Sequence, residues 1–477
     1  MFKKHLQKSY LIIIFISLFL ILPTGWARTT SLNPVLVKDI NPSFQDSSPK
    51  FLVNVNGTLF FRADDGIHGH ELWKSDGTEA GTVMLKEIGT NSSYVSNLVN
   101  FNGTLLFTSN EGPEDVELWK SDGTIDGTVY VTDLPGYMRQ PMVVNDLLFF
   151  ITYDIHGGEL WRTDGTASGT FMVKDIYPGA FSISETPETN VDLTNFNGNV
   201  FFRARNSGFN YELWKSDGTE AGTVMVTDIP YGGLYPDLLT VVGDTLYFAG
   251  GGYASSFYRD ELWKSDGTTA GTVRVKDFEI ENDSEIRGMI NMNGKLLLSI
   301  YEGGAAEEGG SLWESDGTEA GTILLKDNLY TTFSHYHNLP RFKETAMMNG
   351  ILFFLGISND GTGLWKSDGT EAETVFVKEG GGGEMTVVDN LLFFRGSDDA
   401  HGSELWRSDG TTAGTVMVKD LKTGVGAGSW PSYLTEVNGT LFFEADDYHH
   451  GDELWKVSVS DTPAELDHHV YLPTILK

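Results

Sequence analysis

The sequence predicts an all-β protein, a single closed β-propeller of about nine four-stranded antiparallel blades. Three observations lead to this fold. A motif close to Glu-Leu-Trp-Lys-Ser-Asp-Gly-Thr recurs along the chain, every repeat contains four segments with strand-like patterning, and the two ends of the repeat region complement each other. Internal repeats of about 20 to 50 residues are typical of propellers and related arrays. Four-stranded sheets repeated around an axis are propeller blades.

The motif runs from Glu71 to Thr82 in its first copy, and its Leu-Trp pair recurs at a mean spacing of about 48 residues. The nine tryptophans of these pairs are Trp73, Trp119, Trp161, Trp214, Trp263, Trp313, Trp365, Trp406 and Trp455. Blades pack face to face, so both faces of a middle strand are buried. We therefore expect adjacent residues such as Leu72 and Trp73 to lie in the core, without a binding role.

Two kinds of turn connect the strands of each unit. Asn56-Gly57 lies between the first two strands, and Asn-Gly between apolar runs is the strongest short-range signal of a hairpin. Ser75-Asp76-Gly77-Thr78 follows the third strand, where Asp can accept backbone hydrogen bonds and Gly can adopt a positive φ. We interpret the eight Asp-Gly-Thr turns as loop geometry. Calcium binding is the alternative, although each turn has one aspartate where an EF-hand loop has several carboxylates.

The ends of the repeat region predict how the ring closes. Residues 35–40 match the strand that follows each later Asp-Gly-Thr turn, so the N-terminus has one surplus fourth strand. The ninth unit ends after Trp455 and Lys456 without a fourth strand of its own. Pairing the two completes the last blade. The predicted organisation is a signal peptide at 1–27, a propeller of nine repeats at 34–457, and a C-terminal tail at 458–477.

The first 27 residues have the three parts of a secretory signal peptide. Lysines precede an apolar run from Tyr10 to Leu22, and small residues Gly25 and Ala27 follow it. The run is too short to favour a membrane span, and we expect no transmembrane helix in the mature chain. The chain has no cysteine, which excludes disulfides and cysteine chemistry. These features predict a secreted protein, extracellular or at the cell surface.

The formal net charge of −33 limits the classes of partner. A surface this acidic repels nucleic acid and anionic lipid headgroups. It is compatible with cation binding or with solubility alone. We expect a monomer that engages a glycan, a peptide or a cell-surface component.

The repeat resembles the ELWxxDGT repeat of secreted bacterial proteins, because Glu-Leu-Trp, Asp-Gly-Thr and a second Gly-Thr recur together at fixed spacing. The resemblance covers nearly all of the predicted mature chain. Four positions depart from the pattern: Ser311 and Gly363 replace the Glu, Thr163 replaces the Ser, and Glu373 replaces the second Gly. The resemblance implies secretion and a β-propeller-like repeat, and it implies no activity.

Strand direction sorts the connections onto two faces. The Asn-Gly and Asp-Gly-Thr turns, uniform in length, share one face, which we call the turn face. The connections before Glu-Leu-Trp and between units share the other, the loop face, and they vary widely in length. Variable loops on a rigid scaffold are where binding and catalytic residues concentrate. We therefore place the functional site on the loop face.

Three sets of residues on the loop face are candidates. The binding candidates are four histidines that precede Gly, namely His68, His156, His401 and His450, and three arginines that follow Phe-Phe, namely Arg62, Arg203 and Arg395. The calcium candidates are Asp64, Asp65, Asp398, Asp399, Asp446 and Asp447. His with Asp suits a metal site, and a recurring His-Gly also suits a turn. No cofactor is predicted, with calcium as the alternative.

These observations predict an exported binding or scaffold protein that uses the loop face of the propeller. An extracellular hydrolase or lyase is the alternative, since arginines that converge on a propeller axis suit a carboxylate-bearing substrate. No Gly-x-Ser-x-Gly, His-Glu-x-x-His or P-loop motif is present. The sequence therefore favours binding over catalysis and identifies no catalytic residue.

Overall fold

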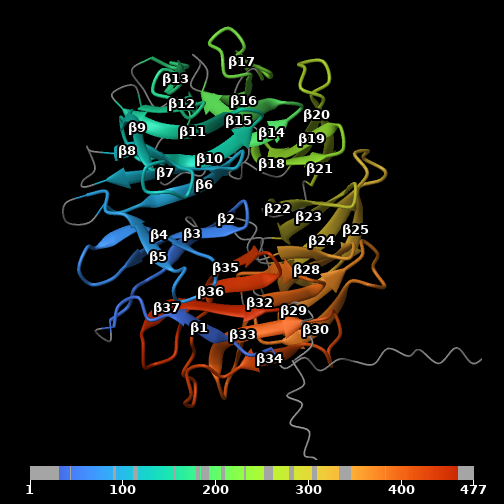
Figure 1. Ribbon diagram of the computed structural model, residues 1–477. Helices are drawn as coiled ribbons and strands as arrows, with labels where there is room; N and C mark the ends of the chain where they lie inside the picture. The colour runs from blue at the N-terminus through green and yellow to red at the C-terminus, as the bar shows by residue number, and fades with distance from the viewer. Residues whose placement is uncertain are drawn as a thin grey trace, which may run out of the picture. The chain divides into compact units, whose positions relative to one another are not determined.

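A computed structural model gives the arrangement of most of the chain, and every regular element that it describes is a β-strand (Figure 1). It describes residues 32–459 except 43–44, 90–92, 111–115, 155–156, 179–182, 184–192, 206–209, 230–232, 252–260, 279–283, 303–308, 332–344 and 382. The predicted signal peptide at 1–27 and the tail beyond 459 lie outside the described residues. In the described part, no helix is long and apolar enough to cross a membrane.

The strands form nine antiparallel sheets, which are the nine predicted blades. Blade 1 consists of β2 (Lys50–Val55), β3 (Thr58–Asp64), β4 (His70–Ser75) and β5 (Val83–Lys86). Blade 2 consists of β6 (Ser96–Phe101), β7 (Thr104–Asn110), β8 (Val116–Ser121) and β9 (Val129–Leu134). Blade 3 consists of β10 (Arg139–Val144), β11 (Leu147–Asp154), β12 (Gly157–Thr163) and β13 (Phe171–Lys174).

The next three blades follow the same order of strands. Blade 4 consists of β14 (Thr194–Phe196), β15 (Asn199–Arg205), β16 (Tyr211–Ser216) and β17 (Val224–Met225). Blade 5 consists of β18 (Asp237–Val242), β19 (Thr245–Gly250), β20 (Glu261–Ser265) and β21 (Val273–Asp277). Blade 6 consists of β22 (Glu285–Met292), β23 (Lys295–Glu302), β24 (Gly309–Ser315) and β25 (Ile323–Lys326).

The last three blades include the two that depart from this order. Blade 7 consists of β26 (Leu329–Thr331), β27 (Thr345–Met348), β28 (Ile351–Ser358), β29 (Gly361–Ser367) and β30 (Val375–Glu379). Blade 8 consists of β31 (Thr386–Val388), β32 (Leu391–Asp398), β33 (Gly402–Ser408) and β34 (Val416–Lys419). Blade 9 consists of β35 (Ser432–Val437), β36 (Thr440–Asp446), β37 (Asp452–Ser458) and β1 (Val35–Lys38).

Blade 7 differs from the predicted four strands. Both β26 and β27 pair with β28, so this sheet contains five strands. Leu329 pairs with Ser358 at one end of β28, and Met348 pairs with Ile351 at the other. The two short strands share the edge that a single innermost strand occupies elsewhere. The blade count is unchanged.

The prediction of ring closure is confirmed. Strand β1 pairs antiparallel with β37, with Leu36 opposite Trp455, and the innermost strands β2 and β35 contact each other across the seam. In Figure 1 the blue strand β1 lies beside the red strand β37. The side chain of Lys456 donates to the Gly77 carbonyl oxygen at 2.7 Å, and that of Asn438 donates to the Gly57 carbonyl oxygen at 3.1 Å. The N-terminal strand thus completes blade 9 and joins it to blade 1.

The repeated turn is explained by a fixed set of hydrogen bonds. In blade 1, the Asp76 Oδ1 atom accepts from the backbone N–H of Thr78 at 2.8 Å and from its hydroxyl at 2.8 Å. The buried Ser75 hydroxyl accepts from the N–H of Gly77 and lies 2.7 Å from the Thr82 hydroxyl.

 

Gly77 has a φ of 89°, and Gly57 in the Asn-Gly turn has a φ of 81°. Both values lie in the left-handed region, where a Cβ atom clashes with the backbone and glycine is preferred. The same bonds recur in the other Asp-Gly-Thr turns, so the turn motif is a structural device, as the sequence predicts.

The lysine of the motif has a role that the sequence did not reveal. The Lys74 side chain donates to the carbonyl oxygen of Gly123 in the next blade at 2.8 Å, and Lys215 and Lys366 make the equivalent bonds to Gly267 and Gly410. On the turn face, Asn56 donates to the Gly103 carbonyl oxygen at 2.8 Å. The repeated polar residues therefore link each blade to its neighbour.

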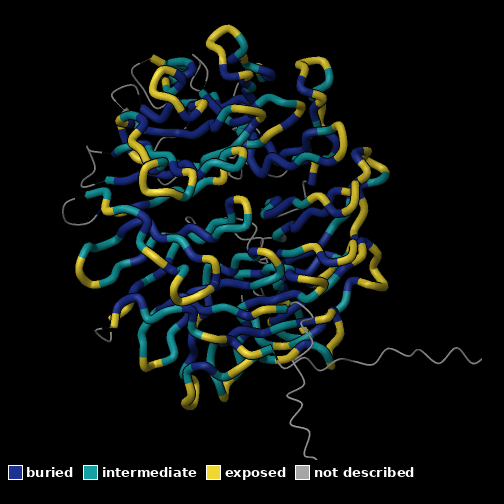
Figure 2. The backbone as a smooth tube through the Cα atoms, in the orientation of Figure 1, coloured by how far each residue is buried: buried dark blue, intermediate teal, exposed yellow. Residues whose placement is uncertain are grey.

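The core lies within and between the blades (Figure 2). Leu72 is 0% exposed and Trp73 is 5% exposed, so both neighbours in the strand are buried, as predicted. Phe61 pairs with Trp73 across the sheet, with ring centroids 6.5 Å apart. Burying a side chain of this size contributes roughly 1.5 to 3 kcal/mol. The nine motif tryptophans are all buried or half-buried.

Candidate functional site

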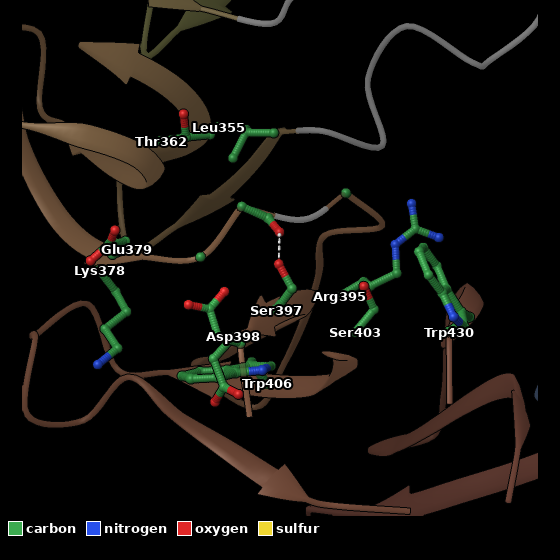
Figure 3. Close-up of a pocket in the computed structure, with 14 residues that line it drawn as sticks. Leu355, Thr362, Lys378, Glu379, Arg395, Ser397, Asp398, Ser403, Trp406 and Trp430 are labelled. Carbon is green, nitrogen blue, oxygen red and sulfur yellow. Dashed lines mark hydrogen bonds between the residues drawn. The ribbon is translucent and has the colours of Figure 1, made fainter. Parts of the chain in front are cut away.

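A pocket of about 940 Å³ opens on the loop face, where the strands of blades 7 and 8 end (Figure 3). Its lining comes from three blades: Leu355, Thr362 and 378–381 of blade 7, Gly383, Arg395, 397–399, Ser403 and Trp406 of blade 8, and Trp430 at the entry to blade 9. The volume is in the range of small-molecule sites. Of the residues predicted from sequence, the pocket includes Arg395, Asp398 and Asp399.

Trp430 gives the pocket an accessible aromatic surface. Its side chain is 62% exposed, whereas Trp406 in the same lining is 7% exposed and belongs to the core. The Trp430 backbone N–H donates to the Ser403 carbonyl oxygen at 3.1 Å. Next to it, the Ser429 hydroxyl and N–H both donate to the buried Glu404 carboxylate. These bonds fix the backbone at Ser429 and Trp430 beside the pocket.

The charged groups of the pocket are separated. Figure 3 shows Arg395 and Trp430 on one side of the view and Glu379 and Asp398 on the other, with Ser397 between them. The Ser397 hydroxyl donates to the Gly381 carbonyl oxygen at 3.2 Å. Among the described residues, no hydrogen bond or ion pair is found for the Arg395 guanidinium. The pocket therefore offers a cation and an aromatic ring at one end, and the Glu379 and Asp398 carboxylates with the Lys378 ammonium at the other.

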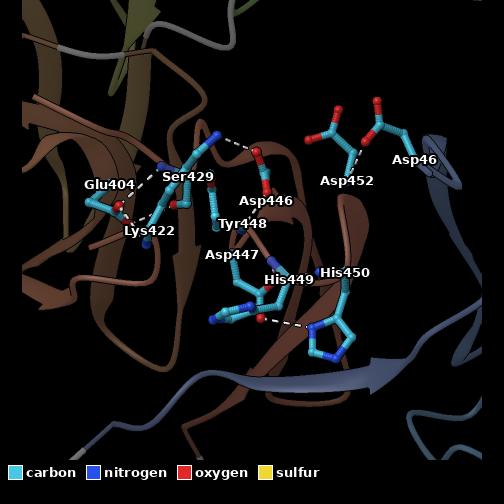
Figure 4. A network of polar contacts seen from close by, with 10 residues as sticks. All are labelled: Asp46, Glu404, Lys422, Ser429, Asp446, Asp447, Tyr448, His449, His450 and Asp452. Carbon is cyan, nitrogen blue, oxygen red and sulfur yellow. Dashed lines mark hydrogen bonds and ion pairs between the residues drawn. The ribbon is translucent and has the colours of Figure 1, made fainter. Parts of the chain in front are cut away.

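The predicted histidines pair with aspartates of their own loops. The Nδ1 atom of His401 lies 2.8 Å from the Asp398 Oδ1 atom, which also accepts from the N–H of His401. This hydrogen bond lowers the pKa of the Asp398 carboxyl and raises the pKa of the His401 ring. An equivalent pair joins His68 to Asp65 at 2.7 Å. Another joins His450 to Asp447 at 2.9 Å, as Figure 4 shows.

These pairs explain the recurring His-Gly as a turn device. Each aspartate accepts backbone N–H groups two and three residues ahead, and the histidine ring closes the loop. His156 lies outside the described residues. In blade 9, Asp446 accepts from the N–H of Tyr448 at 2.6 Å and pairs with Lys422.

The aspartates fit a calcium ion poorly in this arrangement. Calcium takes six to eight oxygen ligands, and the oxygens of Asp65 and Asp447 already accept hydrogen bonds from their own loops. Within the described ranges, no group of three or more His, Asp and Glu side chains is placed to hold a metal ion. Calcium stays a sequence-based alternative.

The predicted arginines occupy one strand position but have different surroundings. The Arg62 guanidinium lies 4.9 Å from the Phe51 ring centroid and donates to the Val95 carbonyl oxygen at 3.4 Å. Burial lowers the pKa of Arg62. In blade 4, Arg203 lies 5.2 Å from the Tyr211 ring centroid. Arg395 alone of the three lines the pocket.

Sequence reasoning missed Glu444, which occupies the same strand position in blade 9, between Arg395 of blade 8 and Arg62 of blade 1. Its side chain is 5% exposed and accepts from the Ser432 hydroxyl at 3.0 Å. Burial raises the pKa of Glu444 to about 7, with a further contribution from Asp452. The signal was present as Phe-Phe-Glu in place of Phe-Phe-Arg, and ring closure brings these three blades together.

No family model matches the chain, and no match is found among curated proteins. Solved structures with some likeness include a puromycin hydrolase, with 12% identity over 86% of this chain and 60% of that chain and a TM-score of 0.41. A structure from work on two prolyl endopeptidases has 9% identity over 85% of this chain and 55% of that chain, with a TM-score of 0.43.

An oligogalacturonate lyase in complex with manganese has 12% identity over 87% of this chain and 99% of that chain, with a TM-score of 0.38. The chain spans about 60% of the length of the puromycin hydrolase. Likenesses of this degree carry no argument about the function of this protein. The functional conclusion therefore depends on the pocket.

Proposed function

We propose that this protein is an exported glycan-binding propeller and that the loop-face pocket between blades 7 and 8 is its binding site. The observation that carries the proposal is the pocket itself, with the exposed Trp430 beside hydrogen-bonding side chains. Sugar rings present apolar C–H faces and polar hydroxyl edges. An aromatic ring can pack on the C–H faces, and protein hydroxyls and carboxylates can hydrogen-bond with the sugar hydroxyls.

Three polar groups of the pocket are suited to sugar hydroxyls. Thr362 and Ser403 offer hydroxyl groups that donate and accept, and Asp399 offers carboxylate acceptors. The anchoring of Trp430 through Ser403 and of Ser429 through Glu404 limits the ordering cost of binding. Export follows from the signal-peptide pattern at 1–27, and the ELWxxDGT resemblance supports it.

A glycan array tests this proposal. We expect the mature protein to retain a subset of oligosaccharides, and the variant Trp430→Ala to lose affinity by at least about tenfold, because a buried aromatic contact often contributes about 2 kcal/mol or more. Tyr448→Ala is the matched control, since Tyr448 is 79% exposed on the loop face and does not line the pocket. Equal losses in both variants, or peptide binding without glycan binding, would overturn the proposal.

The alternative is an exported hydrolase or lyase that acts in the same pocket. Glu379, Asp398 and Asp399 line it and supply the carboxylates that acid–base chemistry on a polysaccharide needs. Bound oligosaccharides would then be cleaved. Incubation of each array hit with the protein, followed by mass spectrometry, separates the two functions. Turnover that Asp399→Asn abolishes would favour the enzyme.

A further inference from the structure

The Arg395 guanidinium is the feature of the pocket that a neutral sugar does not explain. It lies on β32 at the edge of the pocket, and its backbone N–H donates to the Gly383 carbonyl oxygen at 3.0 Å, which fixes the strand there. Its side chain has no hydrogen-bond or ion-pair partner among the described residues. This is unusual in a chain with 66 acidic residues.

Other cations of the chain have partners of their own. Arg62 packs on Phe51 and donates to a backbone carbonyl, Arg274 pairs with Glu261 and Asp277, and Lys422 pairs with Asp446. The Lys378 ammonium of the pocket lies 5.9 Å from the Trp406 ring centroid. Within the described part of the chain, Arg395 is thus a cation on the pocket wall whose side-chain donors have no protein partner.

We propose that the ligand of this pocket is an acidic glycan and that Arg395 binds the carboxylate of one of its sugar residues. The proposal rests on the function proposed above and adds the chemical class of the ligand. A planar guanidinium matches a carboxylate through two parallel N–H to O bonds. Trp430 then packs on the apolar face of the sugar, and Ser397 and Ser403 lie within the same lining to meet its hydroxyls.

The arrangement of charge in the pocket supports one bound orientation. Glu379 and Asp398 lie on the side of the view away from Arg395 (Figure 3), so a carboxylate is favoured at the Arg395 end and repelled at the other. Asp398 is held ionised by its hydrogen bond with His401, which lowers its pKa. The Lys378 ammonium lies on that side as well and offsets part of the negative charge, so the Arg395 end remains the more favourable place for the ligand carboxylate.

The test compares two probes that differ only in their carboxyl groups. A hyaluronan tetrasaccharide carries carboxylates, and its carboxyl-reduced counterpart has hydroxymethyl groups in their place. Calorimetric titration should show that the wild-type protein binds the acidic probe at least about tenfold more tightly, since hydrogen bonds between two charged groups are about twice as strong as neutral ones. Arg395→Gln should abolish this preference and leave the affinity for the reduced probe unchanged.

Two further variants keep the test decisive. Arg203→Gln removes an arginine at the same strand position in blade 4, outside the pocket, and should leave the preference intact. Arg395→Lys keeps the positive charge but lacks the planar guanidinium that binds a carboxylate through two N–H groups, so it should retain part of the preference. This variant provides the test if Arg395→Gln does not fold. Thermal melts establish folding of each variant.

The outcomes separate the two proposals. If both probes bind with equal affinity and Trp430→Ala weakens both, the glycan site stands and the role of Arg395 is overturned. If neither probe binds and no other glycan does, the proposed function fails as a whole. A sulfated tetrasaccharide that binds more tightly than the carboxylated probe overturns the assignment of the charge to a carboxylate.

Discussion

At the residue scale, the glutamate of the repeated motif does more than its place in an alternating strand suggested. The side chains of five of these glutamates are 0% exposed: Glu71, Glu159, Glu212, Glu404 and Glu453. The Glu453 carboxylate accepts from the N–H groups of Ile40 and Asn41 and from the Ser47 hydroxyl, at 2.7 to 3.2 Å. It therefore ties the N-terminal segment to the last blade.

We predict that Glu453 makes stability depend on pH. Burial raises the pKa of its carboxyl from 4.5 to about 7, so the fold favours the protonated form. Stability contributed by this group is then present below pH 4.5 and lost as the pH rises to about 7, by an amount on the order of 3 kcal/mol. Urea denaturation at pH 5 and pH 8 measures the loss.

Glu453→Gln should reduce this pH dependence, because glutamine does not titrate. The part that remains comes from other buried acids such as Glu444, whose pKa is also raised to about 7. Glu79→Gln, on an exposed turn, is the control and should keep the dependence of the wild-type protein. Identical pH profiles for the wild-type protein and Glu453→Gln would contradict the prediction.

At the scale of the element, the length of the outer strand decides what the motif glutamate contacts. In blade 1 the outer strand stops pairing at Lys86, and the departing backbone donates from Ile88 to Glu71. In blade 2 the outer strand continues until Leu134 pairs with Val116, and Glu117 accepts from the Trp119 ring N–H instead. Blade 5 has the same arrangement as blade 2: its outer strand continues until Asp277 pairs with Glu261, and the Glu261 carboxylate accepts from the Trp263 ring N–H.

Blade 7 shows why a departure from the motif is tolerated. Its outer strand also continues, and Gly363 pairs with Glu379 where other blades have the glutamate. A Cβ atom on Gly363 would lie 2.1 Å from the Lys378 carbonyl oxygen. The chain therefore needs a glycine here.

We predict that restoring the motif at this position destabilises the protein. Gly363→Glu forces the backbone of β29 and β30 apart and should cost roughly 1 to 3 kcal/mol, the usual range for overpacking. Glu373→Gly also restores the motif, on an exposed turn, and should change stability by no more than about 0.5 kcal/mol. Denaturant midpoints compare them. A stabilised Gly363→Glu protein would contradict the steric argument.

At the scale of the whole molecule, closure depends on a short strand far from its partner in sequence. Deleting residues 28–41 removes β1 and leaves the edge of β37 unpaired. We expect aggregation and a lower melting temperature, because an exposed strand edge pairs with other chains. Deletion of 28–33 ends before β1 and is the control. A monomeric 28–41 deletion with an unchanged melting temperature would show that β1 is dispensable.

Calcium should contribute nothing measurable to the stability of the ring. The candidate aspartates bond to their own loops, and extracellular calcium modules bind with dissociation constants of only roughly 10⁻⁴ to 10⁻³ M. Melting with chelator and with millimolar calcium, against magnesium at matched ionic strength, should give equal midpoints. A calcium-specific rise that is lost in a variant with Asp64 and Asp65 replaced by Asn would place a site in blade 1.

Much of the fold could be predicted from the sequence because its determinants are local. Asn56-Gly57 and Asp76-Gly77 specify turns through their own backbone preferences, and the surplus strand at 35–40 needs only a count of strands to find its place. The residues of the pocket were harder to predict from the sequence. Arg395 could be singled out from its strand position, but Trp430 enters the pocket through a connection between blades, and its partner Ser403 lies in another blade.

The central claim is that the pocket between blades 7 and 8 binds a glycan, and a crystal structure with a bound oligosaccharide from the array tests it most directly. The account predicts a sugar ring against the Trp430 indole, with a carboxylate at the Arg395 guanidinium. A sugar bound on the turn face, or on the loop face away from Trp430, would contradict it.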